Sequence, residues 1–498
     1  MPGPGWSLRH HRLNGLPAMA WVALVRPPAA ELFFGDSVAT SDGGIFEGTW
    51  VGEPGDLGPL RSTTPFGSGV LRDGERLFLV PPGHMLEGIY LQRLADGGVL
   101  ASNSLTGLLT AAGLELDPAL AYPPMFNESV DGVMHSVIPT LGPPVETLFH
   151  DNLSIDLDGR LAIVPKQREE LFSSFADYRA RLSAALASAL RNAPGYEPVV
   201  TISSGYDGAA LAVLAAELGC RRAVTIAEGK PVAGVAGLSD SGAEVGARLG
   251  MEVGVFPRLA YQQRADLPEA EFLASGFAGE EVVFSEMERE LAGKMLVSGF
   301  YGDGMWWLNR PPRPLLWRSD QSGSSLGEWR LRVGFHHVPL ACFGGHDYRV
   351  TQRISRSPEM RPWTLGRRYD KPIARRILEE AGVPRGTFGE VKRAASGSLH
   401  VDGPAALSPG TRASLAAFAA QEGRRVTFQR RRRALWERAT LKLTRKLGLE
   451  RVAARVERRK FELAVMEPVF GSLLLRWAVS IIRPRYEGVA SLAERDLR

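Results

Sequence analysis

The chain has 498 residues, of which 44% are hydrophobic and 23% are charged, and its formal net charge is +4. This composition is that of an ordinary folded protein and excludes disordered and collagen-like classes, while the length predicts two or three domains. Two cysteines, Cys220 and Cys342, are too few for a disulfide framework, so we expect a reducing, cytoplasmic location. No apolar run reaches the roughly 18 residues that a membrane-spanning helix needs.

Between residues 15 and 165 the sequence predicts short β-strands separated by glycine and proline. β-Branched and aromatic residues favour strands, whereas glycine and proline mark the turns between them. The predicted strands are residues 18–25, 44–51, 69–71, 76–80, 88–93, 153–156 and 161–164. One helix is predicted at residues 104–112.

The apolar run at residues 16–25 follows a basic segment and has some likeness to a secretory signal peptide. The run is short, and Arg26-Pro27-Pro28 behind it is a poor cleavage site. We therefore interpret this run as a first strand.

A phosphate-binding turn is predicted near residue 205. Residues 199–202 have the β-branched pattern of a buried strand, and residues 209–217 have the small apolar pattern of a helix. The turn between them carries Ser203, Ser204, Gly205, Asp207 and Gly208. Free N–H groups at a helix N-terminus favour phosphate, and an aspartate among them is sensible if a divalent metal accompanies that phosphate. The alternative is an ordinary strand-to-helix turn of an α/β sheet.

This turn resembles the pyrophosphate-binding loop, Ser-Gly-Gly-x-Asp-Ser, of the asparagine synthetase family within the PP-loop ATP pyrophosphatases. Ser203, Gly205 and Asp207 match the family pattern, whereas Ser204 replaces its first glycine and Gly208 its final serine. The resemblance implies that this loop binds the phosphates of ATP.

The N-terminal region resembles the Ntn-type glutaminase domain that precedes the synthetase domain in that family. Residues 83–117 look like the family's two strands and Ala-Ser-x-x-x-x-Leu-Leu helix, and residues 140–144 and 153–156 like a later loop and strand. A glutaminase of this kind uses an N-terminal cysteine, but no cysteine precedes Cys220. We therefore expect a retained scaffold that does not hydrolyse glutamine.

The second half of the chain alternates strands and helices. Strands are predicted at residues 222–227 and 253–256, with a helix opened near residue 239 between them. This order predicts a doubly wound parallel sheet that binds ligands at the carboxyl ends of its strands. Ser239 and Asp240 resemble the family's Ser-Asp step, which implies adenine and ribose contacts. Helix capping is the favoured interpretation of these two residues.

A second strand-end loop follows a predicted strand at residues 295–297. The loop resembles the family's Leu-Ser-Gly-Glu-Gly-x-Asp-Glu, with Ser298, Gly299 and Asp303 in register. The resemblance implies one Mg²⁺ held between Asp207 and Asp303 against the phosphates. A glycine-rich loop with a capping aspartate is the alternative.

Three positions of this second loop depart from the family pattern. Phe300 stands at the family's acidic position, Tyr301 at its next glycine and Gly304 at its final glutamate. The family's acid helps to arrange the amine and the acyl-adenylate. Its loss puts amine transfer in doubt more than ATP binding.

Two lysines complete the resemblance. Lys371 opens a segment like the family's Lys-x-x-x-Arg helix, and Lys392 stands at the lysine after its Gly-x-Pro break. Both are expected to be catalytic, because a cation at the α-phosphate stabilises the charge that adenylate formation gathers. A solvated side chain is the alternative for each.

The C-terminal region is basic. Arginine and lysine outnumber acids at residues 424–460 and are interleaved with apolar residues, as in basic amphipathic helices; an apolar segment follows at residues 470–482. Such a segment can bind an anionic surface such as RNA or lipid headgroups. The favoured alternative is a helical extension folded onto the synthetase domain.

The sequence thus predicts an α/β protein with three parts: a glutaminase-like domain at residues 1–165, an ATP-binding synthetase-like domain at 166–402 and a basic helical extension at 403–498. By resemblance, the function is ATP- and Mg²⁺-dependent amide formation through an acyl-adenylate, independent of glutamine. The open alternatives are a non-catalytic scaffold or binding protein, and a PP-loop enzyme that modifies nucleobases or tRNA.

Overall fold

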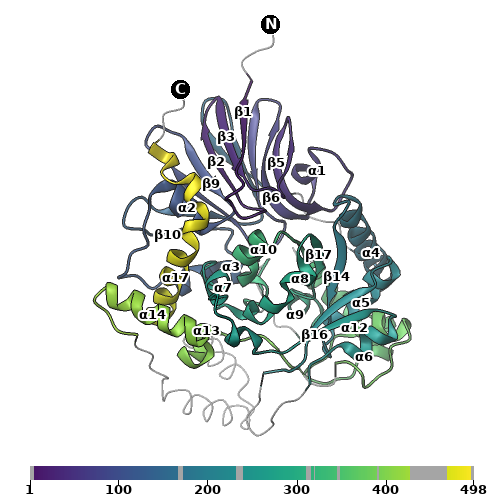
Figure 1. Cartoon of the computed structure of the whole chain (residues 1–498). Coiled ribbons are helices and arrows are strands. Elements are labelled where there is room, and N and C mark those ends of the chain that lie inside the picture. Colours follow the sequence, from purple (N-terminus) through teal and green to yellow (C-terminus); the bar gives the residue numbers. More distant parts are fainter. Residues whose placement is uncertain are drawn as a thin grey trace, which may run out of the picture.

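The computed structural model describes residues 5–166, 172–230, 239–309, 316–318, 320–344, 348–389, 392–426 and 468–494. Two β-sheets form the N-terminal region, and a third sheet with surrounding helices forms the following region (Figure 1). The basic segment highlighted in the sequence lies almost entirely outside the described residues.

The first N-terminal sheet is mixed. β1 pairs parallel to β3, whereas all other neighbouring strands of this sheet pair antiparallel. Its spatial order is β1-β3-β2-β9-β8-β11-β10. Its strands are β1 (Ser7–Arg12), β2 (Trp21–Arg26), β3 (Ala29–Phe34), β8 (Ile89–Arg93), β9 (Val99–Ser102), β10 (His135–Ile138) and β11 (Val145–Leu148).

The second N-terminal sheet is antiparallel throughout, in the order β13-β12-β7-β6-β5-β4. Its strands are β4 (Ala39–Ser41), β5 (Gly44–Trp50), β6 (Pro65–Asp73), β7 (Arg76–Val80), β12 (Asn152–Ile155) and β13 (Leu161–Val164).

The two sheets pack face to face around an apolar core. Trp21 and Ala23 of β2 face Val70 and Leu79 of the second sheet in this core. The alternate residues of β2 face helix α2 (Leu105–Ala112) on the other side. Because both faces of β2 are covered, its sequence is continuously hydrophobic rather than alternating.

The third sheet is parallel, with the strand order β16-β15-β14-β17-β18. Its strands are β14 (Glu197–Thr201), β15 (Arg222–Ile226), β16 (Glu252–Phe256), β17 (Lys294–Val297) and β18 (His336–Val338). The chain runs outward from β14 to β16 and then returns to place β17 on the other side of β14. This reversal is the switch point at which doubly wound sheets bind ligands.

Helices surround the sheets (Figure 1). The remaining α-helices are α1 (Gly58–Arg61), α3 (Pro123–Val130), α4 (Phe175–Arg191), α5 (Asp207–Glu217), α6 (Ala243–Arg248), α7 (Glu269–Leu273), α8 (Glu288–Leu291), α9 (Gly302–Trp306), α10 (Gly327–Val333), α11 (Tyr348–Arg356), α12 (Pro372–Glu380), α13 (Leu399–Asp402), α14 (Pro409–Gln421) and α17 (Pro468–Ile482). Ser104 and Ser174 cap α2 and α4 through their hydroxyl groups, as hydroxyl residues at N-caps commonly do.

One core joins the beginning, middle and end of the chain. It contains Val22 of β2, Leu296 of β17 and Trp477 of α17. Helix α17 packs on α7, and the turn η8 (Arg483–Val489) behind it packs on α2. The described part of the C-terminal extension therefore folds onto both preceding regions, and not onto the second region alone, as the sequence predicts.

The sequence located many of these elements. Strands β7 and β13 match the predicted ranges, and α2 and the five alternating elements from β14 to β16 are confirmed within a few residues. The apolar run at residues 16–25 does contain a strand, but β1 precedes it, so its assignment as the first strand is wrong. Within the described ranges, no helix combines the length and apolarity needed to cross a bilayer.

Candidate active site

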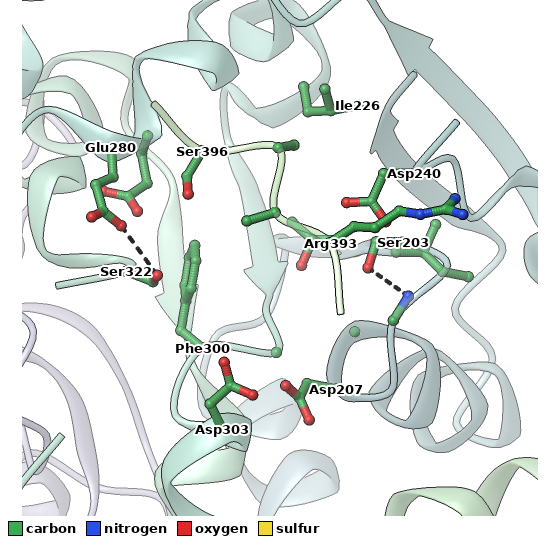
Figure 2. A pocket seen from close by; sticks show the side chains of 18 of the residues that line it. Ser203, Asp207, Ile226, Asp240, Glu280, Phe300, Asp303, Ser322, Arg393 and Ser396 are labelled. Atoms are coloured by element: carbon green, nitrogen blue, oxygen red, sulfur yellow. Dashed lines mark hydrogen bonds between the residues drawn. The ribbon is translucent and has the colours of Figure 1, made fainter. Parts of the chain in front are cut away.

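Two strand-end loops meet at the switch point of the parallel sheet. Strands β14 and β17 are hydrogen-bonded neighbours, with Val200 paired to Val297. The loop after β14 leads to Asp207 at the start of α5, and the loop after β17 leads to Asp303 in α9. Figure 2 shows the two aspartate side chains beside one another.

Glycines allow the two loops to approach within contact distance. A Cβ atom added to Gly299 would lie 2.5 Å from the backbone nitrogen of Gly208. One added to Gly208 would lie 2.7 Å from the carbonyl oxygen of Thr201. Real Cβ atoms do not approach backbone atoms so closely, so these glycines are required by packing rather than by flexibility.

Lys371 links the two aspartates. Its Nζ donates to Asp207 Oδ1 and Oδ2 at 2.7 and 2.5 Å and to Asp303 Oδ1 at 2.6 Å, and its side chain is fully buried. The second oxygen of Asp303 accepts a 2.6 Å hydrogen bond from Lys392, whose side chain is 54% exposed. Lys371 is thus buried and fixed between the two aspartates, whereas Lys392 reaches Asp303 from the surface.

Burial and opposite charges compete in setting the ionisation of Asp207, Asp303 and Lys371. Burial and the neighbouring Asp303 raise the pKa of Asp207 to about 6, against the pull of Lys371. Burial also disfavours ionisation of Asp303, but Lys371 and Lys392 outweigh it and keep its pKa well below the usual range. The two carboxylates in turn raise the pKa of Lys371 despite its burial. At pH 7 Lys371 is therefore a cation between two carboxylates.

A cavity of about 390 Å³ opens beside this cluster. Ser203, Gly205, Gly208, Gly299 and Asp303 line it, together with Asp207, Lys392 and Asp240. Of the predicted site residues, Ser204, Ser239, Ser298 and Lys371 do not line the cavity. Lys371 instead contacts two residues that line the cavity, Asp207 and Asp303.

Hydrogen bonds to Asp240 and within the loop itself hold the 203–205 loop in place. The amide of Ser204 donates to Asp240 O at 3.0 Å, its hydroxyl donates to Asp240 Oδ1 at 2.8 Å, and the amide of Gly205 donates to Ser203 Oγ at 3.1 Å. Two of the amides expected to hold pyrophosphate therefore already have partners within the protein. Phosphate binding here requires that these contacts open or that the lysines carry most of it.

Helix capping by Ser239 or Asp240 is wrong. Helix α6 begins at Ala243 after Gly242 and has no side-chain cap. Asp240 instead fixes Ser204 and is buried at the edge of the cavity, while the carbonyl of Ser239 accepts a hydrogen bond from Arg393. The pair thus connects the 203–205 loop to the segment after Lys392.

Ser298 points away from the cavity. It is completely buried, its amide donates to Val338 O at 3.0 Å, and its hydroxyl lies 2.8 Å from His337 Nε2. The backbone therefore keeps its strand-like pairing with β18 at Ser298, and the first residue of this loop that lines the cavity is Gly299.

Phe300 and Tyr301, the two aromatic residues that depart from the family pattern, shape the loop after β17. Tyr301 has φ of +77°, a conformation that favours glycine, and its hydroxyl accepts the amide hydrogen of Met85 from the N-terminal region. Phe300 lines the cavity, packs edge-on against His337 and lies 6.3 Å from the ring of Phe284. An apolar wall thus stands where the family resemblance implied an acid.

The far end of the cavity contains polar residues that were not predicted from the sequence. Glu280 and Glu281 open the turn η2 (Glu280–Met287), and Arg318, Asp320 and Ser322 face them from a later loop. The available signal was an adjacent pair of acids inside the mostly apolar stretch at residues 272–284. Buried acids without nearby cationic sequence partners are unusual enough to mark a functional site.

The donor set fits Mg²⁺. This ion commonly takes one or two protein carboxylates and completes its shell with phosphates and water. Asp207 and Asp303 face a single nitrogen, Lys371 Nζ, so they already stabilise a positive charge between them. Within the described residues, no group of three or more His, Cys, Asp or Glu side chains could hold a metal ion. Phosphate oxygens and water would have to supply the other ligands.

Comparison with known proteins leaves this geometry as the main guide to function. No known family model matches the chain, and no curated protein is similar to it in sequence.

Proposed function

We propose that this protein is an ATP-dependent ligase that activates a carboxylate as an acyl-adenylate and passes the acyl group to an amine. It would do so without glutamine, in the manner of the synthetase half of asparagine synthetases. In this proposal the N-terminal sheets are an Ntn-type scaffold and the parallel sheet is a PP-loop domain.

The observation that carries the proposal is the meeting of Asp207 and Asp303 at the switch point, each bound to a lysine. Both acids lie at the carboxyl ends of neighbouring parallel strands and at the edge of one cavity. The cavity volume, about 390 Å³, lies within the roughly 300–1,000 Å³ usual for small-molecule sites. Carboxylates paired with lysines suit a metal-bound polyphosphate, because they supply both metal ligands and phosphate-binding cations.

The reaction has two steps. A carboxylate oxygen of the substrate attacks the α-phosphorus of ATP, and the bond to the bridging oxygen breaks to release pyrophosphate. An amine nitrogen then attacks the acyl carbon, AMP leaves, and the amine loses a proton. Both steps move negative charge onto phosphate oxygens, so a nearby cation accelerates them.

Residues of this chain have distinct roles in that scheme. Asp207 and Asp303 would hold Mg²⁺, which neutralises phosphate charge when bound. Lys392 is exposed, and among the described residues its one ion pair is with Asp303, so it can turn to the α-phosphate with little structural cost. Lys371 keeps the two carboxylates together in the absence of nucleotide. Asp240 and the 203–205 loop close the side of the cavity next to β15.

Pyrophosphate exchange tests the proposal. The protein is incubated with ATP, Mg²⁺, labelled pyrophosphate and a panel of carboxylates, and label entering ATP is measured. Exchange that depends on one class of carboxylate supports an adenylating enzyme. If the protein binds ATP in calorimetry but exchanges with no carboxylate, adenylation of RNA or nucleobases becomes the next hypothesis. If it binds no ATP, the scaffold alternative stands.

Three variants locate the chemistry. Asp207→Asn and Asp303→Asn should each nearly abolish Mg²⁺-dependent ATP binding, and the double variant should add little because the residues act as a unit. Lys392→Ala should leave ATP binding nearly intact and lower exchange by about 10²-fold, as expected for a contact that strengthens in the transition state. Asp158→Asn, at an exposed surface position, is the matched control. If all three site variants bind ATP like the parent, the enzyme proposal is withdrawn.

A further inference from the structure

Helix α11 presents a row of arginines to the solvent. Arg349, Arg353 and Arg356 are its exposed residues, and every other residue of the helix is buried. Their i, i+4, i+7 spacing places the three side chains on one face of the helix. At a rise of about 1.5 Å per residue, the row is about 10 Å long. The exposed face of α11 is therefore a continuous line of positive charge.

A second pair of arginines lies next to this row. Arg367 and Arg368 are exposed in the loop before α12. Arg356 donates a 3.2 Å hydrogen bond to the carbonyl of Leu308, and the neighbouring Trp307 donates a 2.8 Å hydrogen bond from Nε1 to the carbonyl of Arg368. The row and the pair thus contact the same short segment. The arginine surface is defined by these five residues: Arg349, Arg353, Arg356, Arg367 and Arg368.

The acids near the arginine surface do not neutralise it. Residues 348–370 contain six arginines but only two acids, Glu359 and Asp370. Glu359 binds an arginine of α12 at 3.0 Å, and Asp370 is buried and accepts two backbone hydrogen bonds of its own loop. Within the described residues, no ion pair joins Arg353 or Arg356 to an acid. An excess of positive charge therefore remains on this face.

This charge fits a nucleic acid better than a membrane or an acidic protein. Membranes and protein partners bury apolar side chains at the centre of the contact. Among the described residues, none of the large exposed hydrophobic side chains belongs to α11, to residues 307–309 or to the loop at 364–370. Phosphate contacts need no apolar surface, and the planar guanidinium group binds a phosphate through two hydrogen bonds. A strand carries a phosphate about every 3.4 Å along its axis, so the row spans about three phosphates.

We propose that the arginine surface binds the phosphate backbone of a single-stranded nucleic acid. Trp307 is half-buried within the segment that both sets of arginines contact, and its ring suits stacking of an unpaired base. Tyr369 follows Arg368 directly and lines the cavity, so a strand bound here runs beside that cavity. Nucleic-acid binding at this surface does not depend on the proposed ligase reaction, because the arginines lie outside the cavity.

The experiment measures binding of the full chain to a fluorescent single-stranded RNA of about 20 nucleotides by anisotropy, without ATP, from 50 to 200 mM salt. We expect the affinity to fall about tenfold or more over this range, because bound counterions are recaptured. The triple variant Arg349→Gln/Arg353→Gln/Arg356→Gln should bind at least about tenfold more weakly at 100 mM salt. Its log–log salt slope should be smaller by about 2, since each contact to a single strand contributes about 0.7.

A second triple variant is the matched control. Arg76→Gln/Arg191→Gln/Arg289→Gln removes the same charge from exposed positions on β7, α4 and α8, and should change the affinity by no more than about twofold. Replacing the three α11 arginines with lysine keeps the charge and should preserve the salt slope, which separates loss of charge from loss of folding. Circular dichroism of each variant checks the fold.

Four further probes test the class of partner: single-stranded DNA, duplex RNA, polyglutamate and phosphatidylserine vesicles. Single strands should bind most tightly. Tighter binding of the duplex, of polyglutamate or of vesicles would overturn the proposal. Parent-like RNA binding by the α11 glutamine variant would also overturn it and would assign the binding to another basic segment, such as residues 424–460. Equal weakening in both glutamine variants would show a dependence on net charge alone and would overturn it too.

Discussion

Gly302 lies against Asp207 so closely that a Cβ atom at position 302 would stand 2.2 Å from the carboxyl carbon of that aspartate. The two residues belong to different strand-end loops, and the absence of a side chain at 302 allows the loops to share one charged cluster. The contact makes the first residue of α9 part of the binding geometry.

Gly302→Ala should therefore damage both stability and the site. We expect a loss of about 1–3 kcal/mol in the free energy of unfolding, because an added methyl group must displace Asp207 or the loop backbone. Mg²⁺-dependent ATP binding should weaken at the same time. Gly327→Ala is the matched control, since Gly327 is the first residue of α10 and has open space around its Cα. Urea unfolding of both variants gives the comparison, and similar losses in the two would argue against the close contact.

Lys371→Met tests the fixed cation between the two aspartates. Removing it leaves Asp207 without a cation and Asp303 with only the exposed Lys392. At pH 7 we therefore expect a loss of about 3–5 kcal/mol in the free energy of unfolding. The pKa of both carboxylates should rise in the variant, and their protonation should reduce the deficit as pH falls from 7 towards 5. Lys294→Met removes a partly exposed pair with Glu197 and should cost less than about 1 kcal/mol. A deficit independent of pH would contradict this account.

The Glu280–Glu281 pair should make stability decrease with increasing pH. The folded-state pKa values of about 8 and about 7 lie above the unfolded value, so the folded protein binds more protons than the unfolded one in this range. The stabilising contribution is complete below about pH 4.3, the unfolded value for glutamate, and is lost as the pH rises through 7 and 8. Glu280→Gln should therefore gain about 1–3 kcal/mol relative to the parent between pH 6 and pH 9. Chemical unfolding at four pH values measures the difference, and a constant difference would refute it.

Arg330→Met tests how the N-terminal sheets are joined to the rest of the molecule. Arg330 of α10 binds Glu47 of β5 at 2.7 Å and Glu87 at 2.6 Å, and its side chain is 3% exposed. Its loss leaves both acids buried without a cation, and we expect to lose about 3–5 kcal/mol. Arg93→Met removes the surface pair with Glu146 and should cost at most about 1 kcal/mol. Equal effects of the two substitutions would show that the buried network contributes no more than a surface pair.

The sequence was most informative where local chemistry decides structure. Strand β7 is bounded by the turn at residues 74–75 and by Pro81, and α2 begins at a serine cap, so both could be located from neighbouring residues alone. Strands β1 and β3 were missed. β1 is largely exposed and lacks a hydrophobic run, while the apolar residues of β3 follow a Pro-Pro pair that suggests a turn.

The site was located less completely, because its geometry depends on residues distant in the chain. The family resemblance implied Asp207, Asp303 and both lysines. Only the folded chain shows that Lys371 is buried between the aspartates while Lys392 is exposed. Ser298 could not be assigned a direction, since that depends on its pairing with β18. Glu280 and Glu281 lie in a 3₁₀ turn without periodic pattern, and the loop at residues 320–325 that holds them follows some 40 residues later.

The packing of α17 against α7, and of the following turn against α2, has a consequence for synthesis of the protein. Tyr486 donates a 2.8 Å hydrogen bond to the buried Glu328, which also accepts from Ser104 at the start of α2. Both partners are translated before the segment that covers them. During translation at about 5–20 residues per second, the apolar faces of α2 and α7 stay uncovered until residues 468–494 emerge. The nascent chain therefore passes through an extended, aggregation-prone interval in which chaperones have a surface to bind.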